Sequence, residues 1–183
     1  MKQLFTALTI LLCSYSQAQN LSKEEQKLYD LVMEYRSEKG LPEIPYSASL
    51  TIVAQMHVKD LQDNDPVTDE CNLHSWSDKG NWTPCCYTDD QAESECMWSK
   101  PAELTNYKGN GYEIACAYWS SDESIVMTAE QALSQWKKSS GHNAVIINKS
   151  IWKNTTWKAI GIGIYKNYAV IWFGEEQDDN TNN

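Results

Sequence analysis

The chain has 183 residues and a formal net charge of −10, with 25 acidic and 15 basic side chains. Such an acidic surface repels nucleic acids and anionic lipid head groups, so neither is expected as a partner. The length is that of one domain with a single hydrophobic core.

Residues 1–18 have the features of a cleavable signal peptide. Lys2 supplies a positive start, residues 4–13 form a short apolar run, and Ser16-Gln17-Ala18 has the small-x-small pattern of a cleavage site. The apolar run is too short to span a bilayer. The sequence therefore predicts a protein that is secreted, or periplasmic in a Gram-negative host, with no membrane span.

Two amphipathic helices are predicted after this segment. Ser22 and Glu25 have the spacing of a capping box, and Gly40 with Pro42 ends the first helix. A second helix begins at Ser47 or Ser49 and stops before the Asn-Asp-Pro at residues 64–66. Its apolar stripe contains Leu50, Val53, Ala54, His57 and Leu61. Because His57 lies on that stripe, it is expected to be a buried structural residue.

Residues 69–110 show no periodicity and are predicted to be a long loop region fastened by disulfides. The predicted mature chain has five cysteines: Cys71, Cys85, Cys86, Cys96 and Cys116. In an oxidising compartment they should form two bridges and leave one thiol, but the spacing does not choose the pairing. The adjacent Cys85 and Cys86 either bond to each other or to separate partners, and separate partners are favoured because a vicinal ring is strained. No pair has the C-x2-C spacing of a zinc-thiolate site.

Aromatic side chains are concentrated in or beside the same region. They include Trp76, Trp82, Tyr87, Trp98, Tyr107, Tyr112, Tyr118 and Trp119. Such residues can form a platform for a sugar, sterol or peptide, or a small core for a segment poor in regular structure. The sequence leaves both interpretations open.

The C-terminal half is predicted to contain a helix, a turn-helix and a hairpin. Periodic apolar residues indicate a helix over residues 129–138, followed by a turn-helix over 140–148. Residues 157–165 and 168–174 read as strands joined by a tight turn. The domain is expected to span residues 19–174 and to end in an acidic disordered tail, 175–183. This order predicts an α+β sandwich with helices packed on a small antiparallel sheet.

Several segments resemble the CAP superfamily (SCP/TAPS), which includes cysteine-rich secretory proteins, antigen 5 and pathogenesis-related proteins of class 1. Gly141-His142-Asn143 and the apolar residues after it follow a helix that carries Trp136, expected to be structural, as in bacterial secreted members. The other matching segments, in the family's order, are Leu73-His74-Ser75, Gly111-Tyr112-Glu113-Ile114-Ala115, residues 160–163 and residues 170–174. The resemblance implies an α-β-α sandwich in which His74, Glu113 and His142 line one cleft.

Two imidazoles and a carboxylate can bind zinc or another divalent cation, or share protons in a pH-sensitive network. The family's usual site adds a second Glu close after Trp136, where this chain has Lys137-Lys138-Ser139. Glu130 lies almost two turns earlier and is expected to point away from the cleft. These departures weaken a metal site, and no cofactor is expected to be required.

The resemblance implies a secreted binding module whose cleft takes a divalent metal, a small apolar ligand or a peptide, or whose partner is an extracellular protein. One alternative is a hydrolase that uses a metal-bound water or a His-Glu pair, and another is a structural adaptor. No pattern of a nucleophilic Ser or Cys with its base is evident, which disfavours an enzyme.

Overall fold

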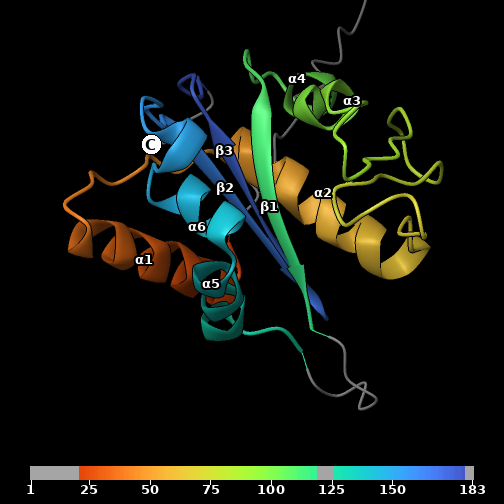
Figure 1. Cartoon of the computed structure of the whole chain (residues 1–183). Helices are drawn as coiled ribbons and strands as arrows, with labels where there is room; N and C mark the ends of the chain where they lie inside the picture. Colours follow the sequence, from red (N-terminus) through yellow and green to blue (C-terminus); the bar gives the residue numbers. More distant parts are fainter. Residues whose placement is uncertain (1–20, 119–125, 180–183) are drawn as a thin grey trace, which may run out of the picture.

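The computed structural model describes residues 21–118 and 126–179. The predicted signal peptide therefore lies outside the described residues, as does Trp119. Four helices carry most of the helical structure: α1 (Lys23–Glu38), α2 (Ala48–Asn64), α5 (Ala129–Lys138) and α6 (Ser140–Ile146). The short helices α3 (Glu95–Trp98), α4 (Lys100–Leu104) and η1 (Ser150–Trp152) complete them (Figure 1).

Three strands form one antiparallel sheet in the order β1-β3-β2. The strands are β1 (Gly111–Ala117), β2 (Ala159–Tyr165) and β3 (Tyr168–Gly174). In the register, Glu113 of the edge strand β1 lies opposite Trp172 of β3. Because β1 is an edge strand, side chains from both of its faces can reach the space beside it.

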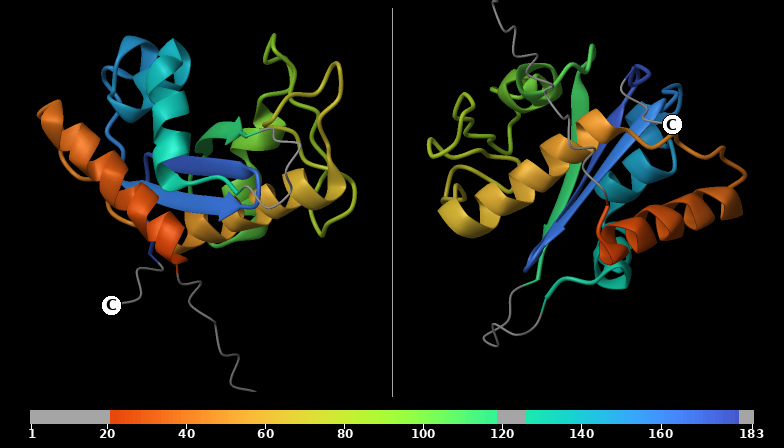
Figure 2. Two further views of the ribbon diagram at one scale, coloured as in Figure 1. Left: turned by 90° about the horizontal axis from the view of Figure 1, so that it is seen from below. Right: turned by 180° about the vertical axis from the view of Figure 1, so that it is seen from behind.

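Helices cover both faces of the sheet and complete the predicted α-β-α sandwich. One core cluster joins α1, α5 and α6 to the sheet through residues such as Trp136 and Ile171. The other joins α2 and the loop region to the opposite face through Trp76 and Trp172. Figure 2 shows α2 crossing the face of the sheet that is hidden behind the strands in Figure 1.

Helix α2 packs directly against the backbone of β2 because two strand residues lack a side chain. A Cβ atom on Gly161 would lie 2.1 Å from the backbone carbonyl carbon of Leu50, and one on Gly163 would lie 2.5 Å from the carbonyl oxygen of Ala54. This close approach fixes α2, and with it His57, against the sheet.

The capping residues in the sequence correctly predict where α1 and α2 begin. Ser22 and Glu25 form the predicted capping box of α1, and Ser47 caps α2 by accepting a hydrogen bond from the Leu50 N–H. The structure differs from the prediction at the C-terminus. Asp178, in the segment expected to be a disordered tail, is buried and accepts hydrogen bonds from the Ser47 hydroxyl (2.6 Å) and the Ser49 N–H (2.8 Å). A carboxylate at the start of α2 satisfies helix N–H groups, which explains why this part of the tail is ordered.

Candidate functional site

The loop region folds back on itself and presents His74. Trp76 and Cys85 exchange backbone hydrogen bonds, and the Asn72 N–H donates to the Tyr87 carbonyl. Asp60 of α2 accepts hydrogen bonds from the Ser77 N–H (2.8 Å) and hydroxyl (2.5 Å). The segment that carries His74 is therefore held both by the returning chain and by α2.

Two disulfides hold this region together. Cys71 is bonded to Cys86, and Cys85 to Cys96, so the adjacent cysteines have separate partners, as favoured. Cys116 is a free, buried thiol, and burial raises its pKa to about 12. A thiol with such a pKa is protonated at neutral pH and is a poor nucleophile.

A cleft with a volume of about 510 Å³ opens beside β1. Its lining comes from the loop region and α3 on one side of β1, and from α6 and η1 on the other (Figure 1). The lining residues are Asn72, His74, Tyr87, Thr88, Asp89, Gln91, Met97, Trp98, Tyr112, Glu113, Gly141, His142, Ile151 and Trp152. The three residues that the resemblance implied, His74, Glu113 and His142, thus line the same cleft.

Glu113 is the centre of a buried hydrogen-bond network. Its Oε1 lies 2.5 Å from His57 Nδ1, and its Oε2 lies 2.8 Å from His74 Nδ1. The side chains of Glu113 and His57 have no exposed surface, whereas that of His74 is 18% exposed. One carboxylate therefore connects a buried imidazole to an imidazole in the cleft.

His57 has a larger role at the cleft than its sequence pattern predicts. It is buried, as predicted, but its ring stacks on Trp76 with 4.3 Å between the ring centroids, and its Nε2 lies 2.9 Å from the Ser75 carbonyl oxygen. Because a carbonyl oxygen only accepts hydrogen bonds, Nε2 must carry a proton. His57 therefore supports the wall of the cleft from within the core.

The protonation states favour an ion pair between His57 and Glu113. Burial lowers the pKa of His57, but the adjacent Glu113 carboxylate outweighs this and raises it overall. Burial likewise raises the pKa of Glu113, but His57 and His74 reverse the direction and lower it. At neutral pH an ionised Glu113 thus accepts hydrogen bonds from both rings.

The charges of this network affect the pKa of His142, although His142 is not hydrogen-bonded to it. Within the described part of the chain its ring makes no hydrogen bond, and it is half-buried at the start of α6. Burial lowers its pKa, a charge on His74 lowers it further, and Glu113 opposes both. His142 is therefore a neutral side chain at neutral pH.

This lowered pKa predicts how stability changes with pH. His142 has a lower pKa in the folded chain than its value of about 6.5 in the unfolded chain, so the unfolded chain binds the proton first as the pH falls. The free energy of unfolding therefore decreases as the pH falls from about 6.5 to the pKa of the folded state. The His142→Ala variant should therefore lose less stability than the parent protein between about pH 7.5 and pH 5. Urea unfolding at both pH values measures this, and an equal loss in the two proteins would contradict the prediction.

The donor set does not fit a zinc ion. Both oxygens of Glu113 already accept hydrogen bonds from imidazoles, and the second Glu of the family's usual site is absent. Across residues 21–118 and 126–179, no group of three or more His, Cys, Asp or Glu side chains is arranged to hold a metal.

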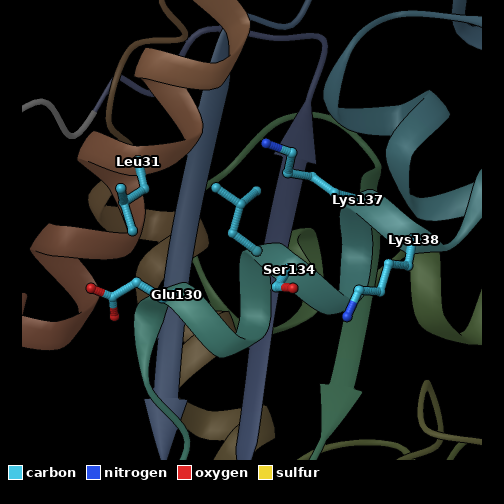
Figure 3. A pocket seen from close by; sticks show the side chains of 6 residues that line it. Leu31, Glu130, Ser134, Lys137 and Lys138 are labelled. Atoms are coloured by element: carbon cyan, nitrogen blue, oxygen red, sulfur yellow. The ribbon is translucent and has the colours of Figure 1, made fainter.

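A second, shallower pocket of about 390 Å³ lies between α1 and α5, and Figure 3 shows that Glu130 faces it. Glu130 pairs with Lys27 of α1 at 2.5 Å, so it points away from the cleft, as expected. Lys137 and Lys138 line the same pocket, and Lys137 Nζ lies 4.1 Å from the centre of the Tyr35 ring. Neither lysine lines the cleft.

The aromatic residues divide between the two roles considered for them. Trp76, Tyr87 and Tyr107 are buried and form part of the second core cluster. Trp98 and Tyr112 are half-buried and line the cleft, and Trp152, outside the aromatic-rich region, joins them there. The aromatic residues therefore form both core and half-buried cleft lining, and Tyr87 belongs to both.

Comparisons with known proteins agree with this architecture. The sequence matches the cysteine-rich secretory protein family (CAP) over residues 29–173. No curated protein matches it. An extracellular protein containing an SCP domain from Bacillus anthracis is similar in structure, with a TM-score of 0.55, 18% identity, and coverage of 84% of this chain and 40% of that one.

Two other solved structures are similar. An outer surface protein from Borrelia burgdorferi has a TM-score of 0.55 and 18% identity over 85% of this chain and 95% of that one. A cysteine-rich secretory protein from Staphylococcus aureus has a TM-score of 0.51 and 14% identity over 84% of this chain and 38% of that one. This chain thus spans about two fifths of the Bacillus and Staphylococcus proteins, and at these identities the likeness concerns the fold.

Proposed function

Because the chain belongs to the cysteine-rich secretory protein (CAP) family, we propose that it is an extracellular binding module whose ligand occupies the cleft at His74, Glu113 and His142. The observation that carries the proposal is the Glu113 network. In this network the Glu113 carboxylate fixes the His74 ring in the cleft, and the buried His57 ring in turn holds the carboxylate. A polar side chain locked in this way is preorganised, which lowers the entropic cost of binding a ligand.

The same geometry supports binding over hydrolysis. The Glu113 side chain has no exposed surface and each of its oxygens accepts a hydrogen bond from an imidazole, so this carboxylate holds the two rings in place and is poorly placed to act as a general base on water. His74 uses Nδ1 for Glu113, which leaves Nε2 as an acceptor for a ligand hydroxyl or amide when the ring is neutral. In this proposal His74 orients a ligand and activates no nucleophile.

Three observations support export. Two disulfides form in the loop region, and such bonds persist in oxidising compartments. The similar structures from Bacillus anthracis and Borrelia burgdorferi are described as extracellular and outer-surface proteins. Residues 1–18 have the pattern of a signal peptide. In the described residues, no helix is long and apolar enough to cross a membrane.

Amide chemical shifts measured with a library of small soluble fragments test the proposal. Fragments should bind and shift a group of amides around His74, Tyr112 and His142. The double variant His74→Ala/His142→Ala should lose these shifts, while Lys137→Ala, at the α1–α5 pocket, should keep them. Fragments that bind only at the α1–α5 pocket would contradict the proposal, and the absence of any binding would favour the adaptor alternative.

A further inference from the structure

Three aromatic rings form one continuous band at the cleft. Trp98 comes from α3, Tyr112 from β1 and Trp152 from η1, and all three are half-buried. The centroid of the Tyr112 ring lies 5.9 Å from that of Trp98 and 5.1 Å from that of Trp152. The planes of these neighbouring rings are inclined by 57° and 66°, so elements distant in sequence contribute three differently tilted aromatic rings to the cleft lining.

The core holds this aromatic band in place. The buried Trp157 packs against Tyr112 at 5.7 Å and against Trp152 at 5.2 Å, and it is backed by Phe173 of β3 at 5.3 Å. Trp157 also donates a hydrogen bond from Nε1 to the Val145 carbonyl oxygen at 3.0 Å. The band is therefore preformed, and a ligand that stacks on it pays little ordering entropy.

Apart from Met97, Gly141 and Ile151, the rest of the lining is polar and mostly uncharged. Asn72, Thr88 and Gln91 carry amides and a hydroxyl, and His74 and His142 carry imidazoles. Amides supply both donors and acceptors, and a neutral imidazole supplies one of each. A ligand that matches this lining has flat apolar faces and a rim of hydroxyl or amide groups.

The charges around the cleft disfavour an anionic ligand. Asp89 and Glu113 are part of the lining, and within the described residues no lysine or arginine lines it. Within the band, burial raises the pKa of Tyr112, and the negative charges of Glu175 and Glu95 raise it further. The buried Glu113 carboxylate is already neutralised by His57, so it adds little attraction for a cationic ligand, and Asp89 is the other carboxylate of the lining.

We propose that the cleft binds an uncharged oligosaccharide of β-1,4-linked, glucose-type rings, which stack on the Trp98–Tyr112–Trp152 band while their hydroxyls bond to the polar lining. In such sugars the substituents are equatorial, so each ring presents a flat C–H face that suits an aromatic surface. The cleft volume of about 510 Å³ lies within the range of small-molecule sites. This inference rests on the proposed function, since it names the ligand class of the same cleft.

Titration of the full exported chain with cellotetraose and chitotetraose, followed by calorimetry and tryptophan fluorescence, tests the inference. At least one of them should bind saturably, and the acidic analogue of cellotetraose, a β-1,4-linked tetramer of glucuronate, should bind about tenfold more weakly or not at all. Trp98→Ala and Trp152→Ala should each weaken binding by about tenfold. Tyr165→Ala, a half-buried tyrosine at the end of β2 outside the cleft lining, should bind like the parent protein.

Folding of each variant is checked by thermal unfolding, and Trp152→Phe, which keeps an aromatic face, should restore most of the affinity. Absence of binding of both neutral sugars up to about 10 mM would overturn the inference, as would binding that the two tryptophan variants leave unchanged. If fragments still bind at the cleft in that case, only the ligand class is wrong. If neither fragments nor sugars bind there, the proposed function falls as well.

Discussion

Replacing His57 by alanine is expected to lower the free energy of unfolding by about 3–5 kcal/mol, because it leaves the buried Glu113 carboxylate without its closest partner. The Nδ1–Oε1 distance of 2.5 Å and the complete burial of both side chains make this the most enclosed ion pair of the described residues. The substitution also removes the hydrogen bond to the Ser75 carbonyl and the stack on Trp76. Urea unfolding at neutral pH measures the loss.

Two controls separate the pair from simple loss of volume. His142→Ala removes the same kind of ring from a half-buried position without a hydrogen bond among the described residues, so it should cost less than about 1 kcal/mol. The double variant His57→Ala/Glu113→Ala leaves no unpaired buried charge, so its loss should be smaller than the sum of the two single losses. A loss below about 1 kcal/mol for His57→Ala, or strict additivity, would contradict the ion pair.

The raised pKa of His57 also sets the direction of a pH effect. A histidine whose pKa is higher in the folded state contributes its full stabilisation below the unfolded value of about 6.5, and this contribution is lost as the pH rises through the folded value. The loss of unfolding free energy caused by His57→Ala, relative to the parent protein, should therefore be larger at pH 6 than at alkaline pH.

The parts of the fold that depend on local signals were predictable. The β3 strand begins and ends at the predicted residues, 168 and 174, and α5 has its predicted bounds, 129 and 138. Each of these elements has a periodic apolar pattern, and a tight turn or a cap fixes its start. Short-range periodicity also placed His57 on the buried face of α2.

The parts that depend on distant pairing were not predictable. The pattern of residues 111–115 resembles a family segment but does not by itself predict a strand, because β1 exists only through its register with β3, more than 50 residues later. The support of Glu113 by His57 joins residues 56 positions apart. Asp178 is ordered by hydroxyl and amide groups at the start of α2, about 130 residues earlier. In each case the partner lies outside the range of any local pattern.

The chain's single arginine, Arg36, is buried at the end of α1 and binds three backbone or side-chain oxygens rather than a carboxylate. It donates from Nη1 to the Ile146 carbonyl (2.5 Å) and to Asn148 Oδ1 (2.7 Å), and from Nε to the Pro42 carbonyl (3.1 Å). Burial lowers its pKa to about 10, so the guanidinium remains charged at neutral pH. This network fixes the chain between α6 and η1, the two elements that bring His142 and Trp152 to the cleft.

Arg36→Met should therefore lower the free energy of unfolding by about 2–4 kcal/mol, because three buried or part-buried acceptors lose a charged donor. Arg36→Lys should lose nearly as much, since one ammonium group cannot reproduce the planar fork that reaches all three. Lys39→Ala removes an exposed charge from the same end of α1 and should cost less than about 0.5 kcal/mol.

The effect of Arg36→Met should also reach the cleft by a defined route. Asn148, which Arg36 orients, has a φ of 48° and donates from Nδ2 to the Thr155 carbonyl at 2.9 Å. Without the arginine this left-handed turn loses its main constraint, so backbone amides of residues 148–155 should exchange with deuterium faster than in the parent protein, beyond any global change. If exchange rises equally in all elements, Arg36 contributes to global stability alone, and the link between α1 and the Trp152 wall of the cleft does not exist.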